Sequence, residues 1–334
     1  MSFLVWRQYR LSAAIAALVL ALFAAVLLVT GFSMAAQWHT LLTKCALSRT
    51  CGDLTGTVSL GGSVAGHDLV ILSLAAPAVF GMLVGAPLLA PEFEARTTEF
   101  AWAQSVTRTR WLLVKIGWAL LAAAIWGGVI AAVVTWWSGP RNALMQDAFE
   151  PNVFDMQGLV PVGYAVFATA LGIAAGAVLR RTLPAVAIVL GGFIGMRWLI
   201  SQAVRSHYMT AVTAYFRVAS DFSPVPGYWG LGGGLISKSG QLVTTPLGAI
   251  ASGNAPATSL PTACQHLIPA SGQVSSAQYN AVVSCLEHAG FRSFATYQPA
   301  SRYWAFQGIE TGIYVTVALL LVAVTYAVVN RRDA

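Results

Sequence analysis

Charged side chains are scarce in this sequence. Of its 334 residues only 9% are Asp, Glu, Lys or Arg, whereas 57% are hydrophobic. An ordinary soluble domain carries about 25% charged residues. A soluble fold could not cover its surface with so few charges, and the composition equally excludes a disordered chain, a coiled coil and a nucleic-acid-binding domain. The sequence therefore predicts a protein that crosses a membrane several times.

The places where charge is missing define the expected spans. A transmembrane helix needs about 20 mostly apolar residues, and six runs satisfy this: 11–34, 69–91, 116–140, 156–179, 182–204 and 311–330. The first run follows Arg7 and Arg10, as in a signal peptide, but it is longer than the usual h-region of about 7–15 residues. We therefore expect an uncleaved anchor there.

The basic residues orient these spans. With both termini cytoplasmic, the short inside pieces 1–10, 92–115, 180–181 and 331–334 hold ten basic residues, and the much longer outside pieces 35–68, 138–155 and 205–310 hold eight. Cytoplasmic loops are normally the ones enriched in Lys and Arg. The net charge of +7 then mostly reflects the basic residues of the cytoplasmic loops. No nucleic-acid partner is expected.

Sequence motifs for several kinds of chemistry are also absent. There is no G-x-x-x-x-G-K-[ST] nucleotide loop and no G-x-S-x-G elbow, so neither ATP binding through a P-loop nor that serine chemistry is expected of this chain. None of the six runs contains Asp, Glu, Lys or His, whereas ion-coupled transporters normally need such groups within the membrane. We expect no catalytic residues, no metal and no cofactor in this chain.

The only charge inside a run is Arg197. It lies near the outer end of the fifth span, where a long basic side chain can extend to the lipid head groups. The alternative interpretation is a substrate path, in which Arg197 contacts an anion together with Ser201 and Gln202.

Four cysteines all fall in the expected outside loops. Even numbers of cysteines in an oxidising compartment favour disulfides. Pairing within each loop gives Cys45–Cys51 and Cys264–Cys285. Buried free thiols are the alternative, and a zinc site is disfavoured because no C-x-x-C spacing occurs.

Small residues recur at a spacing that lets helices approach closely. They are Gly81 and Gly85 in the second span and Gly172 and Gly176 in the fourth. Such positions favour helix packing in lipid, and we expect packing within one bundle rather than a dedicated dimer face.

The loop 205–310 is patterned like a small folded domain. Residues 235–236 and 242–243 flank Ser-Lys-Ser-Gly, which is typical of a hairpin. Ser275 and Gln278 match a capping box, and Gly290 can end the helix that follows. Tyr297–Phe306 is aromatic and is expected at the outer interface.

The inside segment 92–105 contains no Gly or Pro and carries aromatic residues beside mixed charges. This pattern predicts a short helix lying along the membrane as a docking surface, with a solvated loop as the alternative. The expected contact residues are Glu92, Phe93, Glu94, Arg96, Thr97, Glu99, Phe100, Trp102, Gln104 and Arg108.

A resemblance appears over this segment. The pattern from Glu94 through Thr97-Thr98-Glu99-Phe100-Ala101-Trp102 to Lys115 resembles the cytoplasmic loop of bacterial ATP-binding-cassette exporter permeases of the six-helix, drug- and antibiotic-export kind. Residues 161–168, 179–184 and 297–307 are similar to actinobacterial members. The chain departs from the family at Thr97, where many relatives carry glycine.

The resemblance implies an ABC transporter permease that works as a dimer with a second permease, identical or homologous. Two separate ABC ATPase chains would bind ATP and Mg and dock on 92–105 as the coupling helix, and 1–10 would form an interfacial elbow helix. An integral membrane lipid-modifying enzyme, and a membrane anchor or sensor, are the alternatives.

The predicted fold is thus an all-α polytopic protein of the cell membrane, in contact with lipid. It has six transmembrane helices, cytoplasmic N- and C-termini and a small mixed extracellular domain between helices 5 and 6. The expected division is 1–10, 11–204 with the coupling helix, 205–310, and 311–334.

Overall fold

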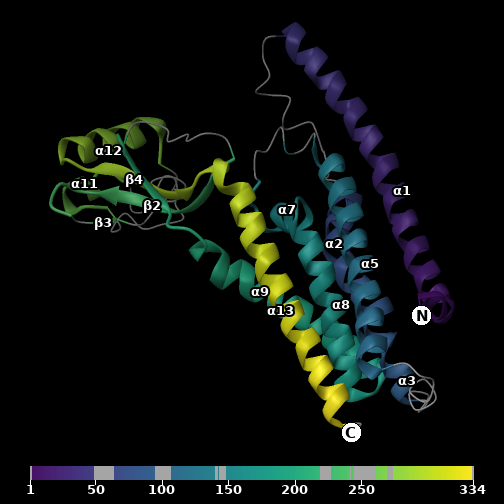
Figure 1. Ribbon diagram of the computed structural model, residues 1–334. Helices are drawn as coiled ribbons and strands as arrows, with labels where there is room; N and C mark the ends of the chain where they lie inside the picture. The colour runs from purple at the N-terminus through teal and green to yellow at the C-terminus, as the bar shows by residue number, and fades with distance from the viewer. Residues whose placement is uncertain are drawn as a thin grey trace. The chain divides into compact units, whose positions relative to one another are not determined.

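The computed structural model describes residues 2–48, 64–94, 107–139, 142, 148–218, 227–240, 242–243, 260–268 and 274–332. The chain divides into two compact units (Figure 1). We call Met1–Gln146, Glu150–Tyr208 and Trp304–Ala334 the helical unit. We call Asp147–Phe149 and Met209–Tyr303 the mixed unit.

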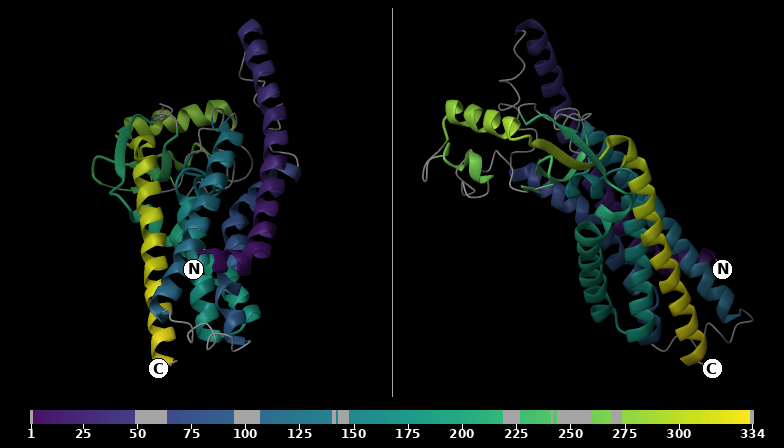
Figure 2. Two further views of the ribbon diagram at one scale, coloured as in Figure 1. Left: turned by 45° about the vertical axis from the view of Figure 1, so that its right-hand side comes forward. Right: turned by 90° about the vertical axis from the view of Figure 1, so that its left-hand side faces the viewer.

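The described residues include six helical stretches long and apolar enough to cross a membrane, as the sequence predicts. They are Ala14–Ser33, Asp68–Glu94, Thr109–Trp137, Val160–Leu179, Thr182–His207 and Ala300–Arg331. The corresponding elements are α1 (Ser2–Ser48), α2 (Val64–Phe80), α5 (Arg108–Trp137), α8 (Val160–Leu179), α9 (Thr182–Leu199) and α13 (Tyr303–Arg332). Helix α13 is the long yellow helix that ends at the C-terminus (Figure 1, Figure 2).

Helix α8 is the centre of the helical unit. It packs against α2, α5 and α9, while α1 lies against α5. Most residues of α8 are buried, including Tyr164, Phe167 and Ile173. In contrast α1, α9 and α13 leave most of their apolar side chains exposed or half-buried, as expected of helices that meet lipid.

Helix α1 runs without a break over Ser2–Ser48, so residues 1–10 do not form a separate element. At 1.5 Å per residue such a helix is about 70 Å long, more than twice the hydrocarbon thickness of about 30 Å. An interfacial role for its first turns stays a prediction.

The second span changes its helical geometry part way. After α2 comes a π-helical turn, Gly81–Gly85, then a 3-10 turn, Ala86–Leu88, and the short helix α3, Ala90–Glu94. A methyl group on Gly81 would lie 2.6 Å from the Ala168 carbonyl oxygen of α8. One on Gly172 of α8 would lie 2.6 Å from the Ala86 nitrogen. The glycines therefore let these two backbones touch, which confirms that they serve packing within the bundle.

The mixed unit is built on a four-stranded antiparallel sheet of order β1-β4-β2-β3. Its strands are β1 (Val212–Phe216), β2 (Trp229–Ile236), β3 (Leu242–Val243) and β4 (Arg292–Gln298). The predicted hairpin is confirmed, since Leu235 pairs with Val243 and Ile236 with Leu242. Tyr297 is paired in β4 and α13 begins at Tyr303, and the expected position of 297–306 at the outer interface stays a prediction.

The described residues of this unit also form the helices α11 (Thr262–Gln265) and α12 (Ser276–His288). The capping box of Ser275 and Gln278 is present, and Gly290 follows the helix with φ +78°. Val282, Val283 and Leu286 of α12 share one core with Leu235 and Val243. The helix is therefore fixed to the hairpin by its apolar face.

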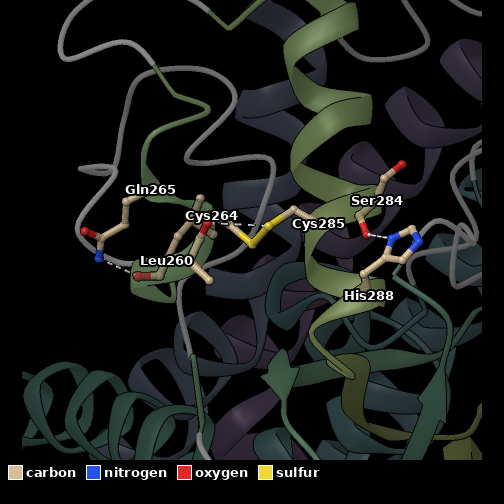
Figure 3. The surroundings of a disulfide bond; sticks show 7 residues. Leu260, Cys264, Gln265, Ser284, Cys285 and His288 are labelled. Carbon is tan, nitrogen blue, oxygen red and sulfur yellow. Dashed lines mark hydrogen bonds between the residues drawn. A yellow bond between two sulfur atoms is a disulfide. The ribbon is translucent and has the colours of Figure 1, made fainter.

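A disulfide joins Cys264 of α11 to Cys285 of α12, as predicted (Figure 3). Beside it the Gln265 side chain donates to the Leu260 carbonyl, and His288 lies against the Ser284 carbonyl within α12. The bridge thus clips α11 to α12. The other predicted pair, Cys45–Cys51, includes Cys51, which lies outside the described residues, so it stays a prediction.

Replacing Cys264 or Cys285 by Ser is expected to destabilise the mixed unit and leave the helical unit assembled. Closing a loop of 21 residues is worth roughly 3 kcal/mol. Intact-mass measurement with and without reductant checks the bridge, and limited proteolysis checks the unit's stability. Four alkylatable thiols in the unreduced protein would contradict this prediction.

Candidate functional site

A cluster of buried charges lies where α13, α7 (Pro151–Met156) and the 3-10 turn Arg205–His207 meet within the helical unit. Arg205 is only 1% exposed and forms two hydrogen bonds to Glu310, Nε to Oε2 at 2.9 Å and Nη2 to Oε1 at 2.8 Å. The hydroxyls of Tyr164 and Tyr208 also donate to Glu310, at 2.9 and 3.2 Å. The Glu310 carboxylate therefore has four donors and no exposed surface.

Asp155 extends this cluster to α9. It forms an ion pair with Arg205 through one oxygen, and its other oxygen accepts from Arg197 Nε at 2.6 Å. The Asp155 side chain is fully buried, while that of Arg197 is 26% exposed. Two arginines and two carboxylates thus form one chain of ion pairs with no net charge, the arrangement that a buried charge requires.

Gln307 lies one helical turn before Glu310 and adds hydrogen bonds to the same region. Its Oε1 accepts from the backbone nitrogens of Leu159 and Val160, both at 2.9 Å, and its Nε2 donates to the Phe154 carbonyl. These nitrogens belong to the start of α8, where backbone N–H groups have no partner within the helix. Gln307 therefore caps α8 and ties α13 to α7.

The position of this cluster contradicts one prediction made from the sequence. The expectation that no acidic, Lys or His side chain lies within a span is wrong, because the spanning stretches include Glu310, Lys115 and His207. The runs free of charge mark only the apolar part of each helix. The fifth and sixth spans extend past those runs, to His207 and back to Ala300.

An apolar pocket of about 340 Å³ lies next to Arg197. It is formed by α2, the π-helical turn, α7 and α9, and all its lining residues belong to the helical unit. Its only polar side chains are Asn152 and Arg197, and the remaining lining is Ile71, Leu74, Ala75, Ala78, Val79, Met82, Leu190, Phe193 and Ile194.

The predicted substrate-path residues are only partly brought together. Arg197 lines the pocket and is paired, because its Nε donates to Asp155 and its Nη2 donates to Asn152. Ser201 donates to the Trp198 carbonyl of its own helix, and Gln202 is exposed. Neither Ser201 nor Gln202 lines the pocket.

The other end of α8 carries a second set of contacts. Glu92 of α3 forms an ion pair with the buried Lys115 of α5. Glu94 Oε1 accepts from the Thr182 nitrogen, the first residue of α9, at 2.8 Å. The Arg180 guanidinium lies 5.1 Å from the Phe93 ring. Helix α3 is therefore attached to α5 and to the turn between α8 and α9.

These contacts concern the first three residues of the predicted coupling helix. Phe93 is half-buried and packs against a cluster that includes Leu89 and Leu112, so it is not the exposed anchor that we expected. The first residues are helical, and Arg108 begins α5. The other predicted contact residues lie outside the described residues: Arg96, Thr97, Glu99, Phe100, Trp102 and Gln104.

The acidic side chains of the charge cluster are engaged by arginines. Asp155 and Glu310 are both fully buried and ion-paired. No group of His, Cys, Asp and Glu suited to a metal ion occurs in the described part of the chain. Spanning helices whose buried charges are paired with one another define a multi-pass membrane protein.

The chain belongs to the family described as ABC-2 membrane transporter related, whose sequence model matches residues 17–205, more than half of its length. It is a permease of the ABC-2 type and a multi-pass protein of the cell membrane. Membership in this family implies partnership with an ABC ATPase. Comparison with curated proteins gives no match. Comparison with solved structures gives none.

Proposed function

We propose that this chain is the permease subunit of an ABC exporter, in which two permeases, identical or homologous, form the substrate path. Two separate ATPase chains bind ATP and Mg and drive it. Three findings support this proposal: the family match, the six spanning stretches and the lack of a nucleotide-binding motif.

The observation that carries the proposal is the attachment of α3. This helix ends at Glu94, so its last three residues begin the segment 92–105 proposed to dock on the ATPase, and Glu94 accepts a hydrogen bond from the first residue of α9. Helix α9 in turn contributes Leu190, Phe193 and Arg197 to the pocket. A displacement of the docking segment therefore has a direct mechanical route to the pocket wall.

Replacing Glu94 with Ala is expected to uncouple the pocket from the ATPase, with at most a partial loss of ATPase binding because the other contact residues are unchanged. A hydrogen bond to a charged group is worth about 1.5–3 kcal/mol, and its loss frees the start of α9 from α3. The readout is maleimide labelling of a Leu190→Cys reporter, with Cys45 and Cys51 replaced by Ser, in the presence and absence of ATP. The ATP-dependent change in labelling should disappear in Glu94→Ala.

The matched control is Asp68→Ala, which removes an exposed carboxylate near the other end of the same span. This variant should keep the ATP-dependent change. Unchanged labelling behaviour in Glu94→Ala, with the ATPase still bound, would show that α3 does not transmit the motion.

A further inference from the structure

The pocket beside α9 presents one charged group to its interior. Arg197 is partly exposed there, whereas the two carboxylates that balance the charges, Asp155 and Glu310, are fully buried. A molecule in the pocket is therefore closer to the Arg197 guanidinium than to the two carboxylates. Since the interaction energy falls with distance, this end of the pocket favours a negative group.

The Arg197 guanidinium also has N–H groups that its two partners do not use. Of its five N–H groups, Nε is used by Asp155 and one on Nη2 by Asn152. The two N–H groups of Nη1 and the second of Nη2 form no other hydrogen bond with the described residues. A guanidinium can bind a planar carboxylate through two parallel hydrogen bonds.

The apolar lining and the volume of the pocket indicate what kind of ligand it can hold. Its nine other lining side chains are all apolar, and its volume of about 340 Å³ lies near the lower limit of about 300 Å³ for ligand sites. Such a volume suits one hydrocarbon chain and is small for a lipid with two chains.

We propose that this pocket binds a single-chain amphiphile with a carboxylate head group, which Arg197 holds while the chain lies between α2 and α9. This inference rests on the proposed transport function and names the substrate class for it. Arg197 keeps its bond to Asp155, so the charge cluster remains intact when the ligand binds.

The test uses the purified full chain in nanodiscs and three ligands of equal chain length: laurate, dodecanol and dodecylamine. Equilibrium binding should follow the order carboxylate, alcohol, amine. Arg197→Gln should weaken laurate binding by about 10- to 100-fold, the effect of losing a charge-assisted hydrogen bond, and should leave dodecanol binding little changed. The control Arg217→Gln, at a side chain 81% exposed in the mixed unit, should bind all three as the unmodified chain does.

A second variant covers the case in which Arg197→Gln fails to fold. Ala75→Phe fills the pocket from α2 and keeps the guanidinium, so it should reduce binding of all three ligands. Leu183→Phe, on an exposed position of α9 away from the pocket, should not.

Equal binding of laurate and dodecanol, or unchanged laurate binding in both Arg197→Gln and Ala75→Phe, would overturn the proposal. Displacement of laurate by an equal concentration of phosphatidylglycerol would overturn the restriction to one chain. No ATPase is present in this assay. Failure of binding therefore rejects the pocket assignment alone, whereas the transport function is tested separately by ATPase association.

Discussion

Replacing Glu310 with Ala should lower the free energy of unfolding of the helical unit by about 3–5 kcal/mol, the usual cost of leaving a buried charge without its partner. Arg205 would lose both of its hydrogen bonds to this carboxylate, and Tyr164 and Tyr208 would lose their acceptor. Asp155 alone would then face two arginines. Thermal unfolding in detergent, followed by size-exclusion chromatography, measures the loss.

A double variant separates charge from packing. Removing both charges, as Glu310→Met with Arg205→Met, should cost less than Glu310→Ala, because an ion pair replaced by apolar groups of similar volume is often neutral in stability. If the double variant is as unstable as the single one, the cluster is held by shape and not by charge balance.

Gly172→Ala should destabilise the helical unit by more than the usual 1–3 kcal/mol for overpacking. The added methyl group would lie 2.6 Å from the Ala86 nitrogen and 2.9 Å from the Gly81 carbonyl oxygen. Both are backbone atoms, so no side chain can rotate away, and α8 must separate from the turns that follow α2. The measurement is again thermal unfolding.

Gly117→Ala is the matched control. Gly117 lies within α5, and a methyl group there meets nothing within 4 Å. Because alanine favours a helix over glycine, this variant should be neutral or more stable by about 1 kcal/mol. Equal destabilisation by both changes would contradict the close contact between α8 and the second span.

The spans and much of the mixed unit were predictable because their signals are local. Six runs free of charge give six spanning stretches, and the hairpin, the capping box and the bridge from Cys264 to Cys285 all follow from short spacings. The helix ends were less predictable. The charge-free runs place Arg205 and Glu310 in a loop, whereas their helices continue past both residues.

The charge cluster depends on contacts between residues far apart in the chain, such as Asp155 with Arg205 and Arg205 with Glu310. No single-sequence pattern encodes such partners. One signal was present: Phe306, Gln307, Glu310 and Tyr314 recur at helical spacing, and all four are fully buried in α13. A helix that buries a carboxylate and an amide on its apolar face should be searched for a cationic partner.

Purification of this permease with its ATPase is the most direct test of the central claim. A tagged chain isolated from its own cells in mild detergent should carry a protein with a G-x-x-x-x-G-K-[ST] motif, and native mass should give two copies of each. Phe100→Ala should weaken that association by roughly 2–4 kcal/mol, as for an aromatic interface anchor, and Glu99→Lys should uncouple hydrolysis. Leu183→Ala should change neither. Recovery of the chain without any such ATPase, or full association and coupling in the Phe100→Ala and Glu99→Lys double variant, would contradict the account.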